Sequence, residues 1–288
     1  MGGKNILLIN DLPGYGKVAL AAMVPILSRM GHYPFQIPTA VVSNTLDYGK
    51  FRIQEMTDYM RDTFLVWKEL GFQIDCVCTG FIVSEEQAEI IERYLKEQKN
   101  APLVVVDPIM ADGGKLYNGI GQNRVLAMKK LAAYADVMVP NITEASFLTG
   151  IRPGQEYGTQ AELRELADGL RAISGKSVVI TSALETKAEE ENGAQGEKTY
   201  LVYGYDHIRQ EYFRVPYDYL PVRVAGSGDI FSAMVIGELL AGNPLAKAVQ
   251  KAVKALSGLI LENQGHLKEY KGILVERYWE VLSHSGED

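Results

Sequence analysis

The chain has 288 residues, of which 47% are hydrophobic and 23% are charged, and its formal net charge at pH 7 is −7. This length corresponds to one large α/β domain or two small ones, with enough apolar residues for a core that needs no disulfides. The negative charge argues against non-specific binding of nucleic acid or of an anionic membrane. It does not argue against binding a nucleotide, because backbone nests and a metal ion hold phosphates locally.

The two cysteines and the N-terminal residues indicate a protein of the cytoplasm. Cys76 and Cys78 are one residue apart in an apolar stretch, a spacing that favours buried thiols over a disulfide or a zinc site. The apolar run Ile6–Ile9 is too short for a signal peptide or a membrane span. We therefore expect no membrane association.

Short apolar strands alternate with amphipathic helices through the first two thirds of the chain. The cap signals include Ser84 with Gln87, the pattern of a capping box, and Thr143 before a short helix. We expect strands over residues 5–9, 37–42, 74–79, 103–106, 136–139 and 177–181, and helices over 18–30, 54–70, 85–97, 123–133, a segment from 143 to 150, and 159 or 160 to 173.

The pattern changes after residue 181. Residues 182–197 are polar and charged and contain glycine, which predicts a mobile loop. This loop is either a solvated surface insertion or a flap that closes over a bound nucleotide. Two extended segments, 198–205 and 208–215, are joined at Asp206 and His207 as an antiparallel hairpin, and three helices follow over 230–241, 245–262 and 273–282.

This order of elements predicts an α/β fold. Alternating strands and helices are typical of a mostly parallel sheet with helices on both faces, and the late hairpin adds a small antiparallel part. The sequence contains no internal repeat, low-complexity linker or clear boundary. We therefore predict a single domain over residues 1–288.

The stretch Ala225–Phe231 combines a glycine-rich loop, a helix start and a carboxylate. Gly226, Ser227 and Gly228 precede Asp229, and an apolar helical pattern follows. Free backbone N–H groups at such a helix start bind anions, and glycines let a phosphate approach closely. A carboxylate beside that nest repels phosphate unless it has another task, such as taking a proton from an attacking hydroxyl. The alternative interpretation is a simple turn in which Asp229 caps the helix.

Polar and acidic residues recur where the predicted strands end. Because ligands bind beyond the carboxyl ends of parallel strands, this edge predicts a shared nucleotide and metal site. A Walker loop and the dinucleotide fingerprint are both missing, and the four histidines show neither metal spacing nor a catalytic triad. The strand ends carry Asn10-Asp11, Thr79-Gly80-Phe81, Asp107-Pro108 with Asp112, Pro140-Asn141 with Glu144, and Thr181-Ser182.

These segments together resemble a known family. Gly226-Ser227-Gly228-Asp229 is similar to the Gly-Thr/Ser-Gly-Asp signature of the ribokinase-like small-molecule kinases, and within them the match is closer to the pyridoxal kinases. The supporting segments are collinear and span nearly the whole chain: Tyr15-Gly16, Val42-Ser43-Asn44, Tyr48-Gly49, Thr79-Gly80-Phe81, Val106-Asp107-Pro108-Ile109-Met110, Val139–Glu144 and Val179–Ser182.

The resemblance implies a ribokinase-like three-layer sandwich and the transfer of a phosphoryl group from MgATP to the 5′-hydroxymethyl group of a B6 vitamer. It also implies use of a monovalent cation such as K⁺, and a homodimer. Asp229 would be the general base, and the amides of Gly226, Ser227 and Gly228 would form an anion hole. The other implied roles are Asp112 and Glu144 near Mg²⁺, Asp107, Val139, Asn141, Glu144, Thr181 and Ser182 along the nucleotide, and Asp11, Thr45 and Phe81 at the substrate ring.

The departures from the family all lie on the ring side. Many pyridoxal kinases have serine at the place of Asp11 and tyrosine at the place of Phe81, and His-Thr where this chain has Thr45-Leu46. These differences leave open a kinase of another heteroaromatic alcohol, such as hydroxymethylpyrimidine. A third reading, a nucleotide-binding regulator without turnover, has no need of Asp229.

Overall fold

The computed structural model describes residues 2–186, 198–222, 224–270 and 272–277. Within them the chain forms two compact units, residues 1–103 with 220–288, and residues 104–219. In the described part of the chain, no helix has the length and apolar character needed to cross a bilayer.

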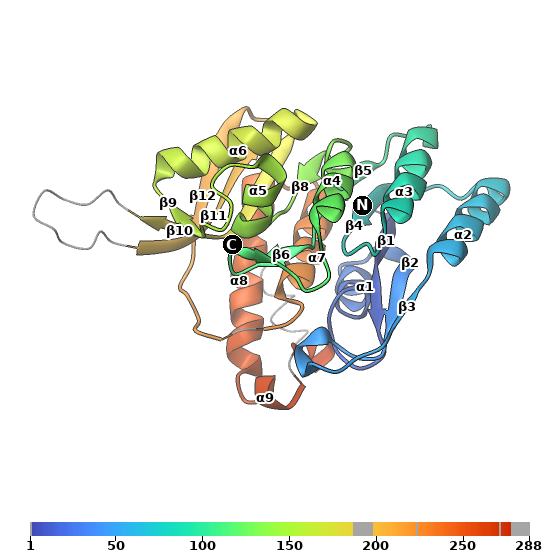
Figure 1. The fold of residues 1–288 in the computed structure, drawn as a ribbon, viewed down its shortest axis with the longest axis horizontal. Helices are drawn as coiled ribbons and strands as arrows, with labels where there is room; N and C mark the ends of the chain where they lie inside the picture. The colour runs from blue at the N-terminus through green and yellow to red at the C-terminus, as the bar shows by residue number, and fades with distance from the viewer. Residues whose placement is uncertain (1, 187–197, 223, 271, 278–288) are drawn as a thin grey trace, which may run out of the picture. The chain divides into compact units, whose positions relative to one another are not determined.

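The first unit is built on a buried parallel strand. Residues Ile6–Ile9 have no exposed surface, as expected for a continuous apolar run in a strand that is covered on both faces. This strand, β1 (Asn5–Pro13), pairs in parallel with β2 (Tyr33–Val42) on one side and β4 (Cys76–Thr79) on the other (Figure 1). The other elements of the first unit are α1 (Leu20–Arg29), η1 (Leu46–Tyr48), β3 (Ile53–Glu55), α2 (Thr57–Leu70), α3 (Glu85–Glu97), α7 (Ser227–Leu240), α8 (Leu245–Asn263), α9 (Leu267–Tyr270) and η2 (Val275–Arg277).

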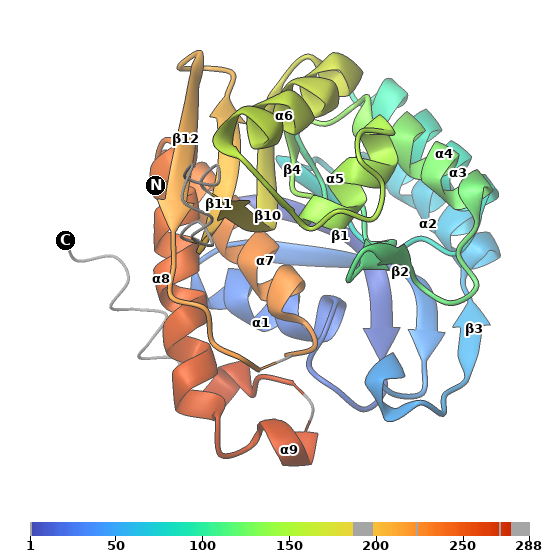
Figure 2. The same ribbon diagram turned by 60° about the vertical axis from the view of Figure 1, so that its left-hand side comes forward.

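The helices of this unit follow from the strand order. The connection from β1 to β2 runs in one direction across the sheet and that from β2 to β4 in the other, so right-handed crossovers place α1 and α2 on opposite faces. Helix α7 packs against both α1 and α8 (Figure 2). The ten residues from Asp229 to Glu238 are buried, which makes α7 the central helix of its layer.

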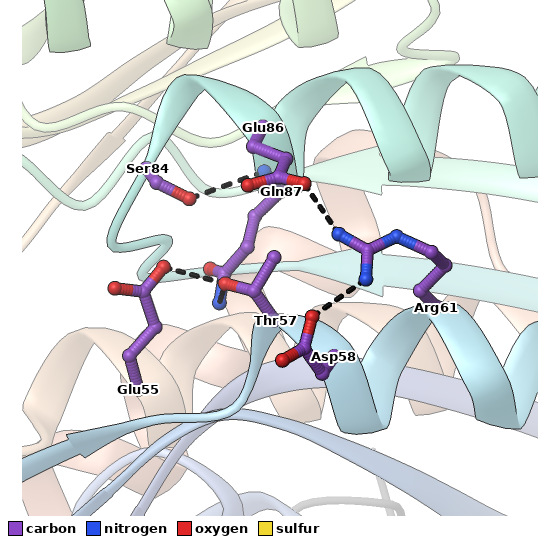
Figure 3. Close-up of polar contacts among 7 residues, drawn as sticks. All are labelled: Glu55, Thr57, Asp58, Arg61, Ser84, Glu86 and Gln87. Atoms are coloured by element: carbon purple, nitrogen blue, oxygen red, sulfur yellow. Dashed lines mark hydrogen bonds and ion pairs between the residues drawn. The ribbon is translucent and has the colours of Figure 1, made fainter.

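A polar junction fixes the start of α3, directly after the loop that carries Phe81. The Gln87 side chain is fully buried; its amide donates to the Thr39 carbonyl oxygen at 2.8 Å and to Thr57 Oγ1 at 3.1 Å. Figure 3 shows the surrounding contacts, in which Ser84 caps α3 and Arg61 of α2 pairs with Glu86 of α3. The loop after β4 is thus held between fixed elements.

The second unit contains the antiparallel part of the fold. Strand β10 (Ser177–Thr186) pairs in parallel with β8 (Val137–Met138) and antiparallel with β11 (Lys198–Asp206), and helix α6 (Gln160–Ser174) lies across this hairpin (Figure 2). The remaining elements are β5 (Leu103–Val106), β6 (Ala111–Asp112), β7 (Lys115–Leu116), α4 (Gln122–Ala132), α5 (Ile142–Thr149), β9 (Tyr157–Gly158) and β12 (Glu211–Pro216).

The α/β class with mostly parallel strands and a late antiparallel hairpin is confirmed. Both cysteines are buried and neither is in a disulfide, as predicted. The single-domain assignment stays a prediction.

Several boundaries were predicted wrongly, mostly where strand pairing overrides local sequence. Strand β1 runs past Asp11 to Pro13 because its pairing with β2 continues beyond a register shift at Asn10 and Leu12. Residues 54 and 55 are not helical, because they belong to β3, which pairs with β2. Residues 182–186 are not a loop but the second half of β10, held by β11.

Three further predictions concern caps, turns and the C-terminal end. Asn141, not Thr143, caps α5, and the hairpin turn covers residues 207–210 instead of Asp206 and His207. Within the predicted helix 273–282, the described part contains only η2. Residues 187–197 of the predicted flap, and 278–282 of that helix, lie outside the described residues.

Candidate functional site

The predicted site residues fall into two sets, one in each unit. The catalytic and ring-side residues belong to the first unit, and the nucleotide and metal residues to the second. The first set is Asp11, Thr45, Phe81, Gly226, Ser227, Gly228 and Asp229, and the second is Asp107, Asp112, Val139, Asn141, Glu144, Thr181 and Ser182.

Gly226 allows the loop to enter α7. It is the N-cap of that helix, and its φ of 80° lies in the left-handed region. A Cβ built at this position would lie 2.7 Å from the Lys17 carbonyl oxygen and 3.1 Å from Cα of Val18. Both the backbone conformation and the close approach of the 17–18 segment therefore require glycine.

The amide groups at the start of α7 suit an anion. The first N–H groups of a helix have no partner within it, and the helix dipole favours negative charge there. The N–H of Ser227 makes only a long contact of 3.4 Å with the Val224 carbonyl oxygen. A Cβ at Gly228 would meet no atom of the described chain within 4 Å, so this end of the loop is open.

Asp229 is a buried carboxylate held at both oxygens. It is 8% exposed; its Oδ1 accepts from Asn10 Nδ2 at 3.1 Å, and its Oδ2 accepts from the Ala19 amide at 2.8 Å. Burial raises the pKa of Asp229 to about 6, and the two hydrogen bonds oppose that rise. The group is thus ionised near neutral pH yet close to its titration range, as a proton acceptor requires.

Asp11 lies near the end of β1, where its carboxylate interacts electrostatically with that of Asp229. Burial, followed by the charge of Asp229, raises the pKa of Asp11 to about 7. Two neighbouring carboxylates resist being charged together, because like charges disfavour the second ionisation. A cation or a hydrogen-bond donor bound next to Asp11 would relieve this repulsion.

Thr45 presents an unused hydroxyl. The residue is 4% exposed, and its Oγ1 has no hydrogen-bond partner among the residues that the structure describes. Its backbone N–H donates to the Tyr15 carbonyl oxygen at 3.0 Å, and its methyl group fills the space beside Gly16. A buried polar group without a partner is costly, so this hydroxyl is well suited to bind a ligand.

Phe81 is placed by the end of β4. Its backbone N–H donates to Asn10 Oδ1 at 2.9 Å, and its side chain is half-buried. This contact joins the ends of β1 and β4, so Phe81 and Asp11 belong to one local arrangement.

The second unit gathers its predicted residues around the start of α5. Asn141 caps this helix in a capping box with Glu144, and it forms a parallel bridge with Thr181 beyond the end of β8. The Val139 amide donates to the Val106 carbonyl oxygen at 2.9 Å, next to Asp107. The ends of β5 and β8 and the middle of β10 thus bring Asp107, Val139, Asn141 and Thr181 together.

Glu144 organises the backbone around itself. Its carboxylate accepts from the amides of Met110 at 3.0 Å, Ala111 at 3.4 Å and Asn141 at 2.9 Å. Burial, followed by the charge of Asp107, raises the pKa of Glu144 well above its usual range. The second carboxylate acting on Glu144 is thus Asp107, whereas Asp112 lies on the β6–β7 hairpin and does not contribute to this shift.

Ser182 occupies an irregular point of β10. Its φ of 55° is in the left-handed region, within a register shift between Ile180 and Ala183. A bulge of this kind re-aims a side chain out of the regular alternation. Because a non-glycine residue rarely adopts such a positive φ, the Ser182 backbone is strained, immediately after Thr181 at the predicted nucleotide edge.

We expect Glu144→Ala to lower the free energy of unfolding by about 2–4 kcal/mol, because three amides lose their acceptor. The control is Glu162→Ala, which removes the equivalent residue of the capping box at the start of α6 but is more exposed and pairs with Arg152. Its loss is expected to cost about 1 kcal/mol. Urea denaturation of both variants measures the difference, and equal losses would contradict the role given to Glu144.

Sequence reasoning missed two residues that contact Asp229. In the sequence Asn10 is only part of a polar strand end, and its side-chain contact with Asp229 joins positions that are 219 residues apart. Ala19 has a φ of 48° although it is not glycine. No residue-type signal predicts that conformation, so the Ala19 amide as a donor to the carboxylate is visible only in the structure.

Comparisons with known proteins show to which family the chain belongs. The family model for phosphomethylpyrimidine kinase matches residues 22–274. A pyridoxine/pyridoxal/pyridoxamine kinase of Bordetella avium is 27% identical, over 84% of this chain and 79% of its own length.

Two solved structures share the fold over almost the whole chain. A Bacteroides thetaiotaomicron protein, described as a phosphomethylpyrimidine kinase and crystallised with pyridoxal, is 32% identical; the match has a TM-score of 0.86 and covers 98% of this chain and 96% of that one. The pyridoxal kinase of Lactobacillus plantarum is 27% identical, with a TM-score of 0.83 and coverage of 98% and 97%. The predicted resemblance to pyridoxal kinases of the ribokinase-like superfamily is thereby confirmed. The chain belongs to the phosphomethylpyrimidine kinase family and is a phosphotransferase that acts on a hydroxyl group.

Proposed function

We propose that this protein transfers the γ-phosphoryl group of ATP to the 5′-hydroxymethyl group of a B6 vitamer, with Asp229 as the general base. The observation that carries the proposal is the buried Asp229 carboxylate in the first turn of α7, directly beside the glycine-rich start of that helix. The relatives named as pyridoxal kinases support a B6 vitamer as the acceptor.

The chemical step needs positioning and charge stabilisation more than covalent catalysis. The hydroxymethyl oxygen attacks the γ-phosphorus, an O–P bond forms, and the bond to the β-phosphate oxygen breaks to release ADP. Because a primary alcohol is a weak acid, its proton passes to Asp229 late in the transfer. Each oxygen of that carboxylate accepts one hydrogen bond, from Asn10 or Ala19, and keeps a lone pair for the proton.

The start of α7 would stabilise the moving phosphoryl group. Amides at a helix start that have no strong partner are donors fixed before the reaction begins, so they cost no reorganisation as negative charge develops. Gly226, Ser227 and Gly228 supply these amides, and the open space beside Gly228 leaves room for the group.

The residues around α5 would bind the nucleotide and its metal. In the described residues no group of three acidic, histidine or cysteine side chains surrounds a single point, but Mg²⁺ in kinases often uses one or two carboxylates together with water and phosphates. Burial and the neighbouring Asp107 both disfavour the ionised form of Glu144 and raise its pKa. A cation bound beside these two carboxylates would favour their ionised forms, so the residues present fit Mg²⁺. Asp107 and Glu144 would hold it, with Asp112 from the β6–β7 hairpin nearby; when bound, it neutralises charge on the phosphates.

The ring-side residues would bind the vitamer. Thr45 offers its unpartnered hydroxyl, Phe81 an apolar ring, and Asp11 a carboxylate whose charge is poorly compensated. We further propose that the Asp11 carboxylate pairs with the cationic amine of pyridoxamine, which the aldehyde pyridoxal lacks.

We expect Asp11→Ser to lower kcat/KM for pyridoxamine relative to pyridoxal by about tenfold, the usual worth of one charged contact. The wild-type preference for pyridoxamine should increase as the pH rises through about 7, because the Asp11 carboxyl loses its proton in that range. Steady-state kinetics with pyridoxal, pyridoxamine and pyridoxine at pH 6 to 8.5 measures both effects. An unchanged preference in the variant would contradict this role of Asp11.

A second candidate acceptor is a pyrimidine alcohol such as hydroxymethylpyrimidine. The family model carries the phosphomethylpyrimidine kinase description, and the Bacteroides relative combines that description with bound pyridoxal. Mass spectrometry of the phosphorylated product, after incubation with MgATP and each alcohol, separates the two acceptors. A protein that binds ADP but phosphorylates neither would be the nucleotide-binding regulator.

Self-association and cation dependence belong to the same proposal. The first unit exposes apolar side chains on β2 and α2, including Tyr33 (58% exposed), Leu65 (57%) and Leu70 (62%). Exposed apolar surface of this kind favours an interface between copies, and light scattering would test for a homodimer. Measuring the activity with and without K⁺ tests the dependence on a monovalent cation. We further propose that the protein is located in the cytoplasm.

A further inference from the structure

The Asn10 side chain connects the base to two strand ends. Asn10 is 2% exposed, and its Oδ1 accepts from the amides of Asp11 at 3.0 Å and Phe81 at 2.9 Å. Because two backbone donors define the oxygen end of this side chain, its NH₂ group must be the end that faces Asp229, at 3.1 Å from Oδ1. The orientation of the donor is therefore fixed by the backbone.

Gly80 provides the space for this side chain. A Cβ built on Gly80 would lie 2.4 Å from Nδ2 and 2.5 Å from Cγ of Asn10, far inside van der Waals contact. Gly80 is not among the glycines with positive φ, so its backbone conformation is open to any residue. The lack of a side chain at position 80 is thus explained by the presence of Asn10.

The other oxygen of Asp229 is held by an equally specific contact. Ala19, whose amide donates to Oδ2 at 2.8 Å, has φ and ψ of 48° and −129°. A non-glycine residue in this region is strained and persists only where its surroundings impose it. The Asp229 carboxylate therefore accepts a hydrogen bond at Oδ2 from Ala19, the N-cap of α1, and at Oδ1 from Asn10 of β1.

We propose that Asn10 is a positioning residue for the catalytic base: it orients the Asp229 carboxylate toward the acceptor hydroxyl and favours its ionised form, and Gly80 is required to admit the Asn10 side chain. This inference rests on the proposed role of Asp229 as the base. A hydrogen bond to the ionised form of an acid stabilises that form, and a fixed carboxylate avoids the entropy of finding its reactive orientation.

Few charged groups of the described chain surround Asp229, and Asp11 is the carboxylate that interacts with it. Asp11 on β1 faces it; α1 carries only Arg29 at its last residue, and α7 carries Glu238 near its other end. Lys17, on the loop between β1 and α1, is paired with Glu276. Burial already raises the pKa of Asp229, so loss of the Asn10 hydrogen bond must raise it further.

The experiment compares Asn10→Ala, Gly80→Ala and the double variant in the full-length protein. Each single variant should lower kcat about tenfold or more and move the acidic limb of the kcat–pH profile upward by roughly one pH unit, with the KM for ATP unchanged. In the double variant, Gly80→Ala should add nothing, because the side chain it displaces is gone. The matched control is Gly265→Ala, where an added Cβ meets nothing within 4 Å; wild-type kinetics are expected.

Asn10→Asp keeps an acceptor for the two amides but replaces the amide donor with a second carboxylate beside Asp229, so it serves if Asn10→Ala does not fold. Loss of the donor and the added like charge both disfavour the ionised form of Asp229, so the acidic limb should move upward by at least as much as in Asn10→Ala. An unshifted limb in folded Asn10→Asp or Asn10→Ala, when Asp229→Asn is inactive, would overturn the role of Asn10. Additive losses in the double variant would overturn the link to Gly80. Normal turnover of Asp229→Asn would instead refute the role of Asp229 as the general base, on which this inference rests.

Discussion

Asp229→Asn is expected to lower kcat by about 10²–10⁴-fold, the usual contribution of a general base. The substitution keeps the size of the side chain but removes its capacity to accept the hydroxyl proton. ADP affinity should be nearly unchanged, because Asp229 is predicted to take the proton of the acceptor hydroxyl and is not among the residues predicted along the nucleotide. Steady-state kinetics and calorimetric ADP titration measure the two quantities.

The matched control for this experiment is Asp62→Asn, which removes the same charge from an exposed position on α2. Its kcat should equal that of the wild type. A turnover of Asp229→Asn within a few fold of the wild-type value would contradict the assignment of the base. Thermal melts of both variants show whether the comparison is made between folded proteins.

Gly226→Ala should lower kcat by about 10²-fold or more, comparable with the loss of an oxyanion-hole donor. The added methyl group would press on the Lys17 carbonyl oxygen at 2.7 Å, and alanine is strained at a φ of 80°. Because the obstacle is backbone, the start of α7 must move, and its amides move with it. Kinetics at saturating ATP measure the loss.

Gly119→Ala is the control that separates backbone strain at a positive φ from displacement of a neighbouring backbone segment. Gly119 has a similar φ of 83°, but nothing lies within 4 Å of its Cβ position. This variant should lose some stability and keep its kcat. If Gly226→Ala retains more than about half of the wild-type kcat, the amides at the start of α7 do not form the anion hole that we propose.

The sequence predicts elements well where the determining signal is local. Helix α3 runs from Glu85 to Glu97 as predicted, since Ser84 caps it and its apolar residues recur with helical period. Strand β5 is equally clear, as a short apolar run before Asp107 and Pro108. The glycine-rich entry into α7 and the carboxylate in its first turn also follow from neighbouring residues alone.

Features that depend on distant partners escaped prediction. Residues 182–186 look like a loop by composition, yet pairing with β11 makes them strand. The contact of Asn10 with Asp229 spans 219 positions, and no pattern in either segment signals it. The strained Ala19 backbone is imposed by its surroundings, so its residue type gives no indication of it.

The measurement that tests the central claim most directly is ADP release, coupled to a detection system, with pyridoxal, pyridoxamine, pyridoxine and hydroxymethylpyrimidine as acceptors. We predict that at least one B6 vitamer has a kcat/KM exceeding that of the pyrimidine alcohol by about tenfold or more, and that Asp229→Asn abolishes this turnover. A higher kcat/KM for hydroxymethylpyrimidine, or no ADP release above the rate without acceptor, would contradict the assignment of this protein as a B6 vitamer kinase.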